Sequence, residues 1–126
     1  MKLFDSTVLI AHLRGVPDAT ALLREAVQAR GATCSVLSRV ELEGGMRRPG
    51  ERSAVARLFG VLRMEPVTET IARRAGEHLR SYRRSHPGID VVDCVIAATV
   101  EVLGAELLTL NVKHFPMLPG LEPAFT

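Results

Sequence analysis

The sequence contains no tryptophan, one tyrosine and only two cysteines among its 126 residues. With so few aromatic rings, stacking on bases cannot carry recognition of a nucleic acid, and phosphate contacts would have to dominate. Cys34 and Cys94 each lie inside an apolar run and form no C-x-x-C spacing. This pattern indicates two small buried side chains rather than a disulfide or a zinc site.

Long hydrophobic runs are also absent. The longest apolar stretch, from Val91 to Leu103, is interrupted by Asp93 and Glu101, and a bilayer span needs about 18 or more apolar residues. The N-terminus carries one lysine followed by Asp5, unlike the basic and apolar regions of a signal peptide. These features predict a cytoplasmic protein that has no membrane partner.

The order of apolar runs and breakers predicts an α/β fold. Hydrophobic residues make up 47% of the sequence, and neither a repeat nor a low-complexity linker divides it, so one domain over residues 1–126 is expected. Strands are expected at 1–4, 33–37, 64–67 and 106–109, with a further edge strand at 121–124. Helices are expected at 7–13, 18–30, 38–45, 52–63, 69–84 and 90–103, with Asp18, Ser38 and Thr68 as N-caps.

Acidic or amide side chains follow the apolar runs in four segments, at Asp5, Glu41, Asp93 and Asn111. In an open parallel sheet the functional crevice lies at the carboxyl ends of the strands, where these side chains would converge. Three carboxylates brought there would hold a hard divalent cation through oxygen ligands. Asp5, Glu41 and Asp93 are therefore predicted metal ligands and catalytic residues of a nuclease-like site.

Two of these acids have structural alternatives as capping residues. Asp5 could cap the following helix, although Ser6 could do the same without placing a charge there. The segment from Ser38 to Glu41 matches a capping box, in which the glutamate reaches back to the serine backbone. Both alternatives stay open at this point.

The third acid has the strongest case for function. Asp90 could cap its helix with Asp93 in the first turn, where the helix dipole favours negative charge. Asp93, however, lies within a run of valine, cysteine and isoleucine, and a buried carboxylate is costly unless a cation or hydrogen bonds compensate it. Asn111 and His114 follow the last strand, as site residues or as simple loop residues.

The arginines gather in the middle of the chain, although the formal net charge is only +2. The candidates for contact with a nucleic acid backbone are two adjacent pairs, Arg47 with Arg48 and Arg73 with Arg74. The alternative is an ordinary solvated helix face.

A stripe of apolar side chains recurs at helical spacing within residues 52–63, at Val55, Leu58, Phe59 and Leu62. Such a stripe is either ordinary core or the floor of an exposed groove with a basic rim. An exposed groove would suit a partner that docks as an amphipathic helix.

Four segments together closely resemble the PIN-domain ribonucleases, and among them the VapC-type toxins of bacterial and archaeal toxin–antitoxin pairs. The segments are LFDSTVLI at 3–10, SVLSRVELEGG at 35–45, GIDVVDCVIAAT at 88–99 and LLTLNVKHFP at 107–116. They occur in the family's order and at its typical spacing, over nearly the whole chain. A single motif would be weak, whereas four in order are specific.

The resemblance implies a PIN-like three-layer α/β/α sandwich around a mostly parallel sheet of four to five strands. It also implies a Mg²⁺- or Mn²⁺-dependent endoribonuclease, forming a homodimer and silenced by a VapB-like antitoxin that the 55–62 stripe would contact. By position, Asp5, Glu41 and Asp93 match the family's acidic site residues, and Thr109 matches the hydroxyl that supports the first of them. Asn111 and His114 stand where relatives often carry a fourth acid, so this chain departs from the pattern there.

Two other functions remain to be weighed. A PIN-like module that binds RNA or protein without turnover would also fit a chain that lacks the fourth acid. Metal-dependent RNA cleavage would distinguish the ribonuclease from this binding module. A phosphatase of the haloacid dehalogenase type would need a second aspartate two residues after Asp5, where this chain has Thr7.

Overall fold

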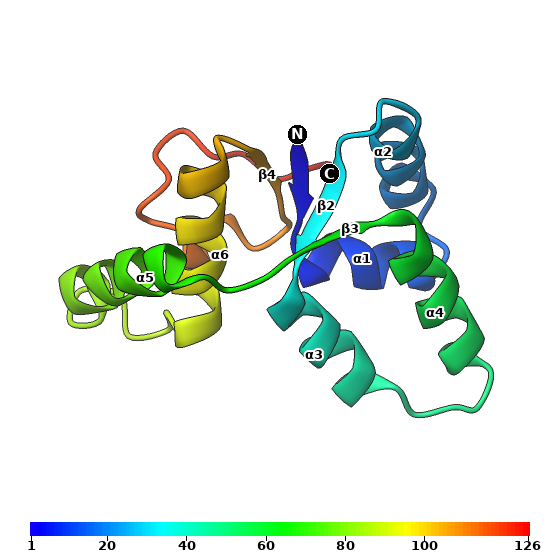
Figure 1. Ribbon diagram of the computed structural model, residues 1–126, viewed down its shortest axis with the longest axis horizontal. Helices are drawn as coiled ribbons and strands as arrows, with labels where there is room; N and C mark the ends of the chain where they lie inside the picture. Colours follow the sequence, from blue (N-terminus) through cyan, green and yellow to red (C-terminus); the bar gives the residue numbers. More distant parts are fainter.

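A four-stranded sheet organises the computed structural model, which describes residues 1–126. Figure 1 shows its strands, β1 (Lys2–Phe4), β2 (Ala32–Ser35), β3 (Arg63–Glu65) and β4 (Glu106–Leu108). The helices are α1 (Ser6–Leu13), α2 (Pro17–Gln28), α3 (Val36–Gly45), α4 (Glu51–Val61), α5 (Glu69–Tyr82) and α6 (Val91–Leu103), with a short 3-10 helix, η1 (Val112–His114). None of these helices is long and apolar enough to cross a bilayer.

The sheet is entirely parallel and has the order β3-β2-β1-β4. The four strands expected from the sequence are present, but the further edge strand at 121–124 is wrong. That segment makes one backbone bond to the sheet region, from the Ala124 N–H to the Thr109 carbonyl at 2.9 Å. Pro119 and Pro123 flank and interrupt it, and proline cannot donate to a ladder of hydrogen bonds.

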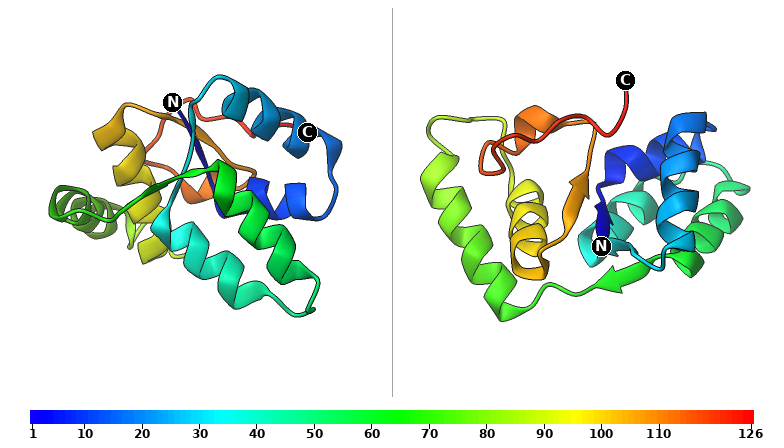
Figure 2. Two further views of the ribbon diagram at one scale, coloured as in Figure 1. Left: turned by 45° about the vertical axis from the view of Figure 1, so that its right-hand side comes forward. Right: turned by 90° about the horizontal axis from the view of Figure 1, so that it is seen from above.

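Helices cover both faces of the sheet, which confirms the predicted α/β/α sandwich. In Figures 1 and 2, α1 to α4 lie on one side and α5 and α6 on the other. The alternation of side chains along β1 divides the core between them, since Phe4 packs with α1 to α4 and Leu3 packs with α5 and α6. Strand β1 therefore contributes one side chain to the core on each side of the sheet.

Helix α6 is the central support of the second half. Seven consecutive residues, from Cys94 to Val100, are buried, and Ala97 and Ala98 are fully inaccessible, so the helix lies close to the sheet. Burying each Val or Ile side chain of this run contributes about 1.5–3 kcal/mol. Gly104 ends the helix in the left-handed conformation, with a φ of 64°, as expected for a glycine stop.

Two predicted helix starts are wrong by one and two residues. Helix α2 begins at Pro17, whose fixed φ suits the first helical position, and Asp18 lies inside its first turn instead of capping it. Helix α3 begins at Val36, and its cap is Ser35, whose Oγ accepts from the Leu37 N–H at 3.1 Å. The predicted Thr68 cap is confirmed by a 3.2 Å bond from the Ile71 N–H.

The apolar stripe of α4 belongs to the core. Val55, Leu58, Phe59 and Leu62 are between 2% and 8% exposed, and all four pack into the α1 to α4 half. The Arg39 guanidinium lies 4.9 Å from the centre of the Phe59 ring, in a cation–π arrangement. Of the two alternatives left open for this stripe, the structure supports the core, because α4 turns this face towards the sheet.

Candidate functional site

The carboxyl ends of the strands form an acidic edge. Asp5 directly follows β1, while α3 follows β2 without a connecting loop. Figure 1 shows that the first turns of α3 and α6 lie at the edge where β1 and β2 end. Parallel pairing therefore brings residues from three distant segments to one side of the sheet.

Asp5 is held in place by two threonine hydroxyls. Asp5 is buried, with 7% of the residue exposed, and its Oδ2 accepts from Thr109 Oγ1 at 2.8 Å and from Thr7 Oγ1 at 3.1 Å. The residue occupies the N-cap position of α1, but its side chain makes no capping bond. The capping alternative is therefore wrong, and the orientation of this carboxylate is set by the loop that follows β4.

The two hydroxyls are themselves fixed by backbone groups. The Leu110 N–H donates to Thr7 Oγ1, and the Asn111 N–H donates to Thr109 Oγ1, both at 3.0 Å. The sequence predicts the supporting role of Thr109 but not that of Thr7. The Asn111 side chain forms no hydrogen bond, so only its backbone takes part in this network.

Glu41 is joined to α1 instead of to its own helix start. Ser6 Oγ donates to Glu41 Oε1 at 2.7 Å, and Ser6 is 6% exposed. Because α3 begins at Val36, two residues before Ser38, the proposed capping box does not form. Ser38 lies fully buried in α3, and its Oγ has no hydrogen-bond partner.

Asp93 lies in the first turn of α6, in a reciprocal capping box with Asp90. The Asp93 N–H donates to Asp90 Oδ1 at 2.9 Å, and the Asp90 N–H donates to Asp93 Oδ2 at 3.3 Å. His114 Nδ1 lies 3.4 Å from the same Oδ2. Burial and then the neighbouring Asp90 carboxylate raise the pKa of Asp93 to about 6. A cation at this carboxylate would therefore relieve an unfavourable charge.

The predicted arginine pairs differ in their surroundings. Arg73 forms an ion pair with Glu69 at 2.7 Å, and Arg74 pairs with Glu77 at 3.0 Å and Glu101 at 2.8 Å. Arg47 and Arg48 are exposed and form no side-chain ion pair, so half of the predicted nucleic acid contacts are already neutralised within the protein.

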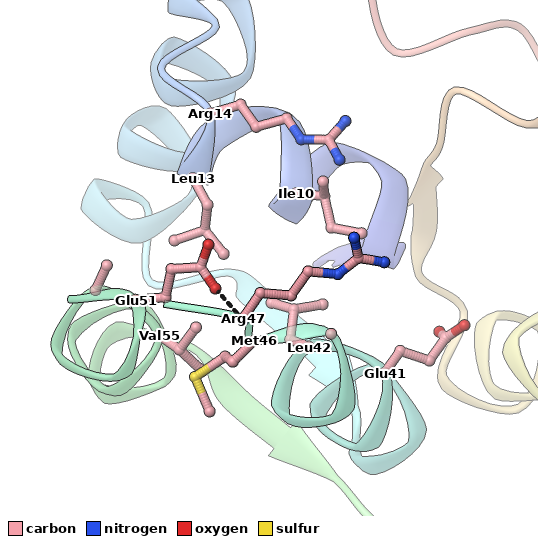
Figure 3. A pocket seen from close by; sticks show the side chains of 11 residues that line it. Ile10, Leu13, Arg14, Glu41, Leu42, Met46, Arg47, Glu51 and Val55 are labelled. Carbon is pink, nitrogen blue, oxygen red and sulfur yellow. Dashed lines mark hydrogen bonds between the residues drawn. The ribbon is translucent and has the colours of Figure 1, made fainter. Parts of the chain in front are cut away.

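A groove extends from the acidic edge between α1, α3 and α4. It has a volume of about 470 Å³, and Figure 3 shows Glu41 near one end and Glu51 and Val55 near the other. Ile10, Leu13 and Leu42 provide apolar walls, while the side chains of Arg14 and Arg47 lie over it. The groove is thus apolar inside and charged at its rim.

A model of the PIN domain matches residues 2–117. The chain belongs to the PIN-domain family. It is 52% identical over 125 residues to Ribonuclease VapC10 of Mycobacterium tuberculosis, covering 99% of this chain and 93% of the relative. It is 47% identical over 126 residues to Ribonuclease VapC19 of the same species, covering 99% and 100%. The predicted resemblance to VapC-type PIN proteins is therefore confirmed.

Solved structures share this PIN fold. A toxin–antitoxin complex from Klebsiella pneumoniae has a TM-score of 0.78 at 22% identity, with 99% of this chain and 98% of that chain covered. VapBC2 from Rickettsia felis, bound to a promoter DNA fragment, has a TM-score of 0.75 at 20% identity, with 95% and 94% covered. At these identities the likeness establishes the fold.

Each of the three acids keeps one carboxylate oxygen free of protein partners. Asp5, Glu41 and Asp93 each use one carboxylate oxygen in the contacts above, and the second oxygen of each accepts no hydrogen bond. Oxygen ligands of this kind are those that Mg²⁺ and Mn²⁺ prefer. No three His, Cys, Asp or Glu side chains lie close enough together to hold one ion. Joint binding of one ion by the three acids stays a prediction.

Proposed function

We propose that this protein is a VapC-type endoribonuclease toxin that cleaves RNA with Mg²⁺ or Mn²⁺ held by Asp5, Glu41 and Asp93. The observation that carries the proposal is the acidic edge, where each carboxylate is anchored through one oxygen and keeps the other without a protein partner. The two ribonuclease relatives, similar over almost the whole chain, support the same activity.

The residues of the edge have distinct roles in this proposal. Thr109 and Thr7 orient Asp5, and Ser6 orients Glu41, so little reorganisation is needed when ligands bind. Asp93 completes the set from α6, with the Asp90 N–H and His114 both at its Oδ2, so that its Oδ1 keeps no protein partner. The chemistry that a bound divalent ion supplies in such a site is activation of a water for attack on phosphorus and neutralisation of phosphoryl charge.

RNA cleavage with and without the divalent ion tests the proposal. The purified protein should cleave RNA in Mg²⁺ or Mn²⁺ and lose this activity in EDTA. Asp93→Asn should lower the cleavage rate by at least about 100-fold while the protein stays folded, because a charge that stabilises the transition state is lost. Asp90→Asn is the matched control, since asparagine is also a good N-cap, and it should cost much less.

The alternative function predicts the opposite outcome. A PIN-like module that only binds RNA or protein would give no metal-dependent cleavage. Equal activity of Asp93→Asn and the unmodified protein would overturn the assignment of Asp93 to the site.

The groove beside Glu41 is the proposed docking site for a VapB-like antitoxin. An amphipathic segment would place apolar side chains against Ile10, Leu13 and Leu42, and a basic side chain could reach Glu41. Of the α4 stripe, Val55 lines this groove, and Leu58 lines a neighbouring one, whereas Phe59 and Leu62 line neither. The solved toxin–antitoxin complexes with this fold support such a partner, and we also expect a homodimer.

Ala54 offers a test of the docking site because it lines the groove and is only partly buried. Ala54→Trp should fill the groove and weaken inhibition by the protein that the neighbouring gene encodes, with RNA cleavage retained. Ala56→Trp is the matched control, on an exposed position of the same helix. Inhibition that is equally strong in both variants would place the antitoxin elsewhere.

A further inference from the structure

The end of α5 and the turn that follows it carry a group of arginines without acidic partners. Arg80, Arg83 and Arg84, called here the 80–84 arginine cluster, are exposed and form no ion pair. No aspartate or glutamate occurs between Glu77 and Asp90. This contrasts with Arg73 and Arg74 on the same helix, whose charges are neutralised by three glutamates.

The cluster is held by an ordered backbone. Arg83 has helical φ and ψ angles of −59° and −27°, and its N–H donates to the Leu79 carbonyl at 3.0 Å. Arg80 and Arg83 therefore lie three residues apart on one face of α5. The turn continues with a 2.8 Å bond from the His86 N–H to the Tyr82 carbonyl, and these two rings meet edge to face at 5.7 Å.

The cluster leads directly into the acidic edge. Asp90, which caps α6, lies six positions after Arg84, so their Cα atoms are at most about 20 Å apart. The turn that carries the cluster is the one that enters α6, as Figure 2 shows. An RNA strand bound at the cluster would therefore have at most about this distance to span to reach the first turn of α6, where Asp93 lies.

We propose that Arg80, Arg83 and Arg84 bind backbone phosphates of the RNA substrate and position the strand on the Asp93 side of the acidic edge. The inference rests on the proposed ribonuclease function and deepens it. Charge complementarity selects RNA as the occupant, because a polyphosphate pairs with arginines whose own protein offers them no carboxylate. The scarcity of aromatic residues makes phosphate contacts the available mode of binding.

The decisive measurement is the salt dependence of RNA binding. A fluorescent single-stranded RNA of about 20 nucleotides and mixed sequence is titrated with the full chain carrying Asp93→Asn, so that cleavage does not interfere. Adding Arg80→Gln, Arg83→Gln and Arg84→Gln together should raise Kd at least about tenfold at low salt. It should also reduce the slope of log K against log salt by about 2, at about 0.7 for each lost phosphate contact.

Three controls separate this role from other effects. Replacing Arg24, Arg52 and Arg57 by glutamine removes the same charge from the other side of the sheet, and it should change the slope much less. The single variant Arg80→Gln is compared with Arg73→Gln, which removes another arginine of the same helix. Lysine at positions 80, 83 and 84 keeps the charge and should retain most of the binding, which guards against a folding defect in the glutamine variant.

The outcomes are distinct. Equal slopes for the cluster variant and the charge-matched control would overturn the inference, and so would a cluster variant that binds RNA normally but loses its antitoxin. If the inference holds, the glutamine variant of the cluster, made without Asp93→Asn, should cleave RNA with a raised KM and a largely unchanged kcat. The cluster positions the substrate and does not touch the reacting atoms. If the unmodified protein does not cleave RNA in any divalent ion, the proposed function itself fails.

Discussion

The two sides of the sheet are built differently. On the α5 and α6 side, α6 is buried along most of its length, and polar contacts link it to α5 through Arg74, His78 and Glu101. On the other side, α1, α3 and α4 diverge and leave the groove of about 470 Å³ (Figure 3). One side is a rigid support, and the other leaves room for a partner.

Each side nevertheless contributes to the same acidic edge. Glu41 comes from the α3 side, where it is exposed at the end of the groove. Asp93 comes from the α6 side, where it is partly buried and its pKa is raised by burial and by Asp90. The comparison teaches that Glu41 is accessible to a partner in the groove, whereas Asp93 is held by the α5 and α6 side.

The largest effect is expected from Phe59→Asp, which would break the α1 to α4 half. Phe59 is 8% exposed, and placing a carboxylate there should cost more than about 4 kcal/mol of unfolding free energy. The variant should be largely unfolded by circular dichroism. Val61→Asp, at a neighbouring position that is 50% exposed, is the control and should stay folded. If the Phe59→Asp variant stays folded, Phe59 does not lie in the core and the stripe is exposed.

A smaller effect is expected in the supporting half, from Glu101→Gln. Burial alone would raise the pKa of Glu101, but hydrogen bonds from Arg74 and His78 outweigh it and lower the pKa. Because a lowered carboxyl pKa adds stability above its unfolded value, the variant should lose about 1–2 kcal/mol at pH 7. This difference should disappear as the pH falls through the lowered pKa, as urea unfolding can measure. A pH-independent loss would indicate packing instead of charge.

Asp93→Asn should change stability in the opposite direction from Glu101→Gln and raise the free energy of unfolding at neutral pH in metal-free buffer. With a folded-state pKa of about 6, Asp93 keeps a proton that the unfolded chain releases, so stability falls as the pH rises from about 4 to about 6. Above this window the variant should be more stable than the unmodified protein by about 1 kcal/mol, and at pH 4 the two should be equal. Urea unfolding in EDTA across this range measures the difference. A destabilised variant at pH 7 would mean that the capping box outweighs the charge.

The smallest effect is expected from Asn111→Asp. The Asn111 side chain forms no hydrogen bond, so a carboxylate there would add a fourth acid without breaking a contact. Calorimetric titration with Mn²⁺ should show a several-fold gain in affinity, since ligand charge tunes such sites. Unchanged affinity would mean that Asn111 serves only the turn after β4.

Several of the errors arise because contacts between distant segments decide what local sequence leaves open. Ser35 and Ser38 are both plausible caps, and local sequence cannot decide between them because the choice depends on where β2 stops pairing with β1 and β3. The same limit applies to Arg73 and Arg74, since part of their charge is neutralised by Glu101, 27 residues beyond Arg74. Thr7 was missed as a support for Asp5 because its partner contacts, Thr109 and Leu110, lie more than 100 residues away.

The sequence by itself determined the four parallel strands, most of the helices and the order in which the acidic motifs occur, because apolar periodicity and glycine or proline breakers act locally. It also identified Asp5, Glu41 and Asp93 as the acids to consider, and the family to which the chain belongs. Only the tertiary structure decided what each acid touches, that the α4 stripe is buried and which arginines remain free of partners. These outcomes depend on contacts between distant segments, and the energy of such a contact is set by packing and desolvation after the sheet has formed.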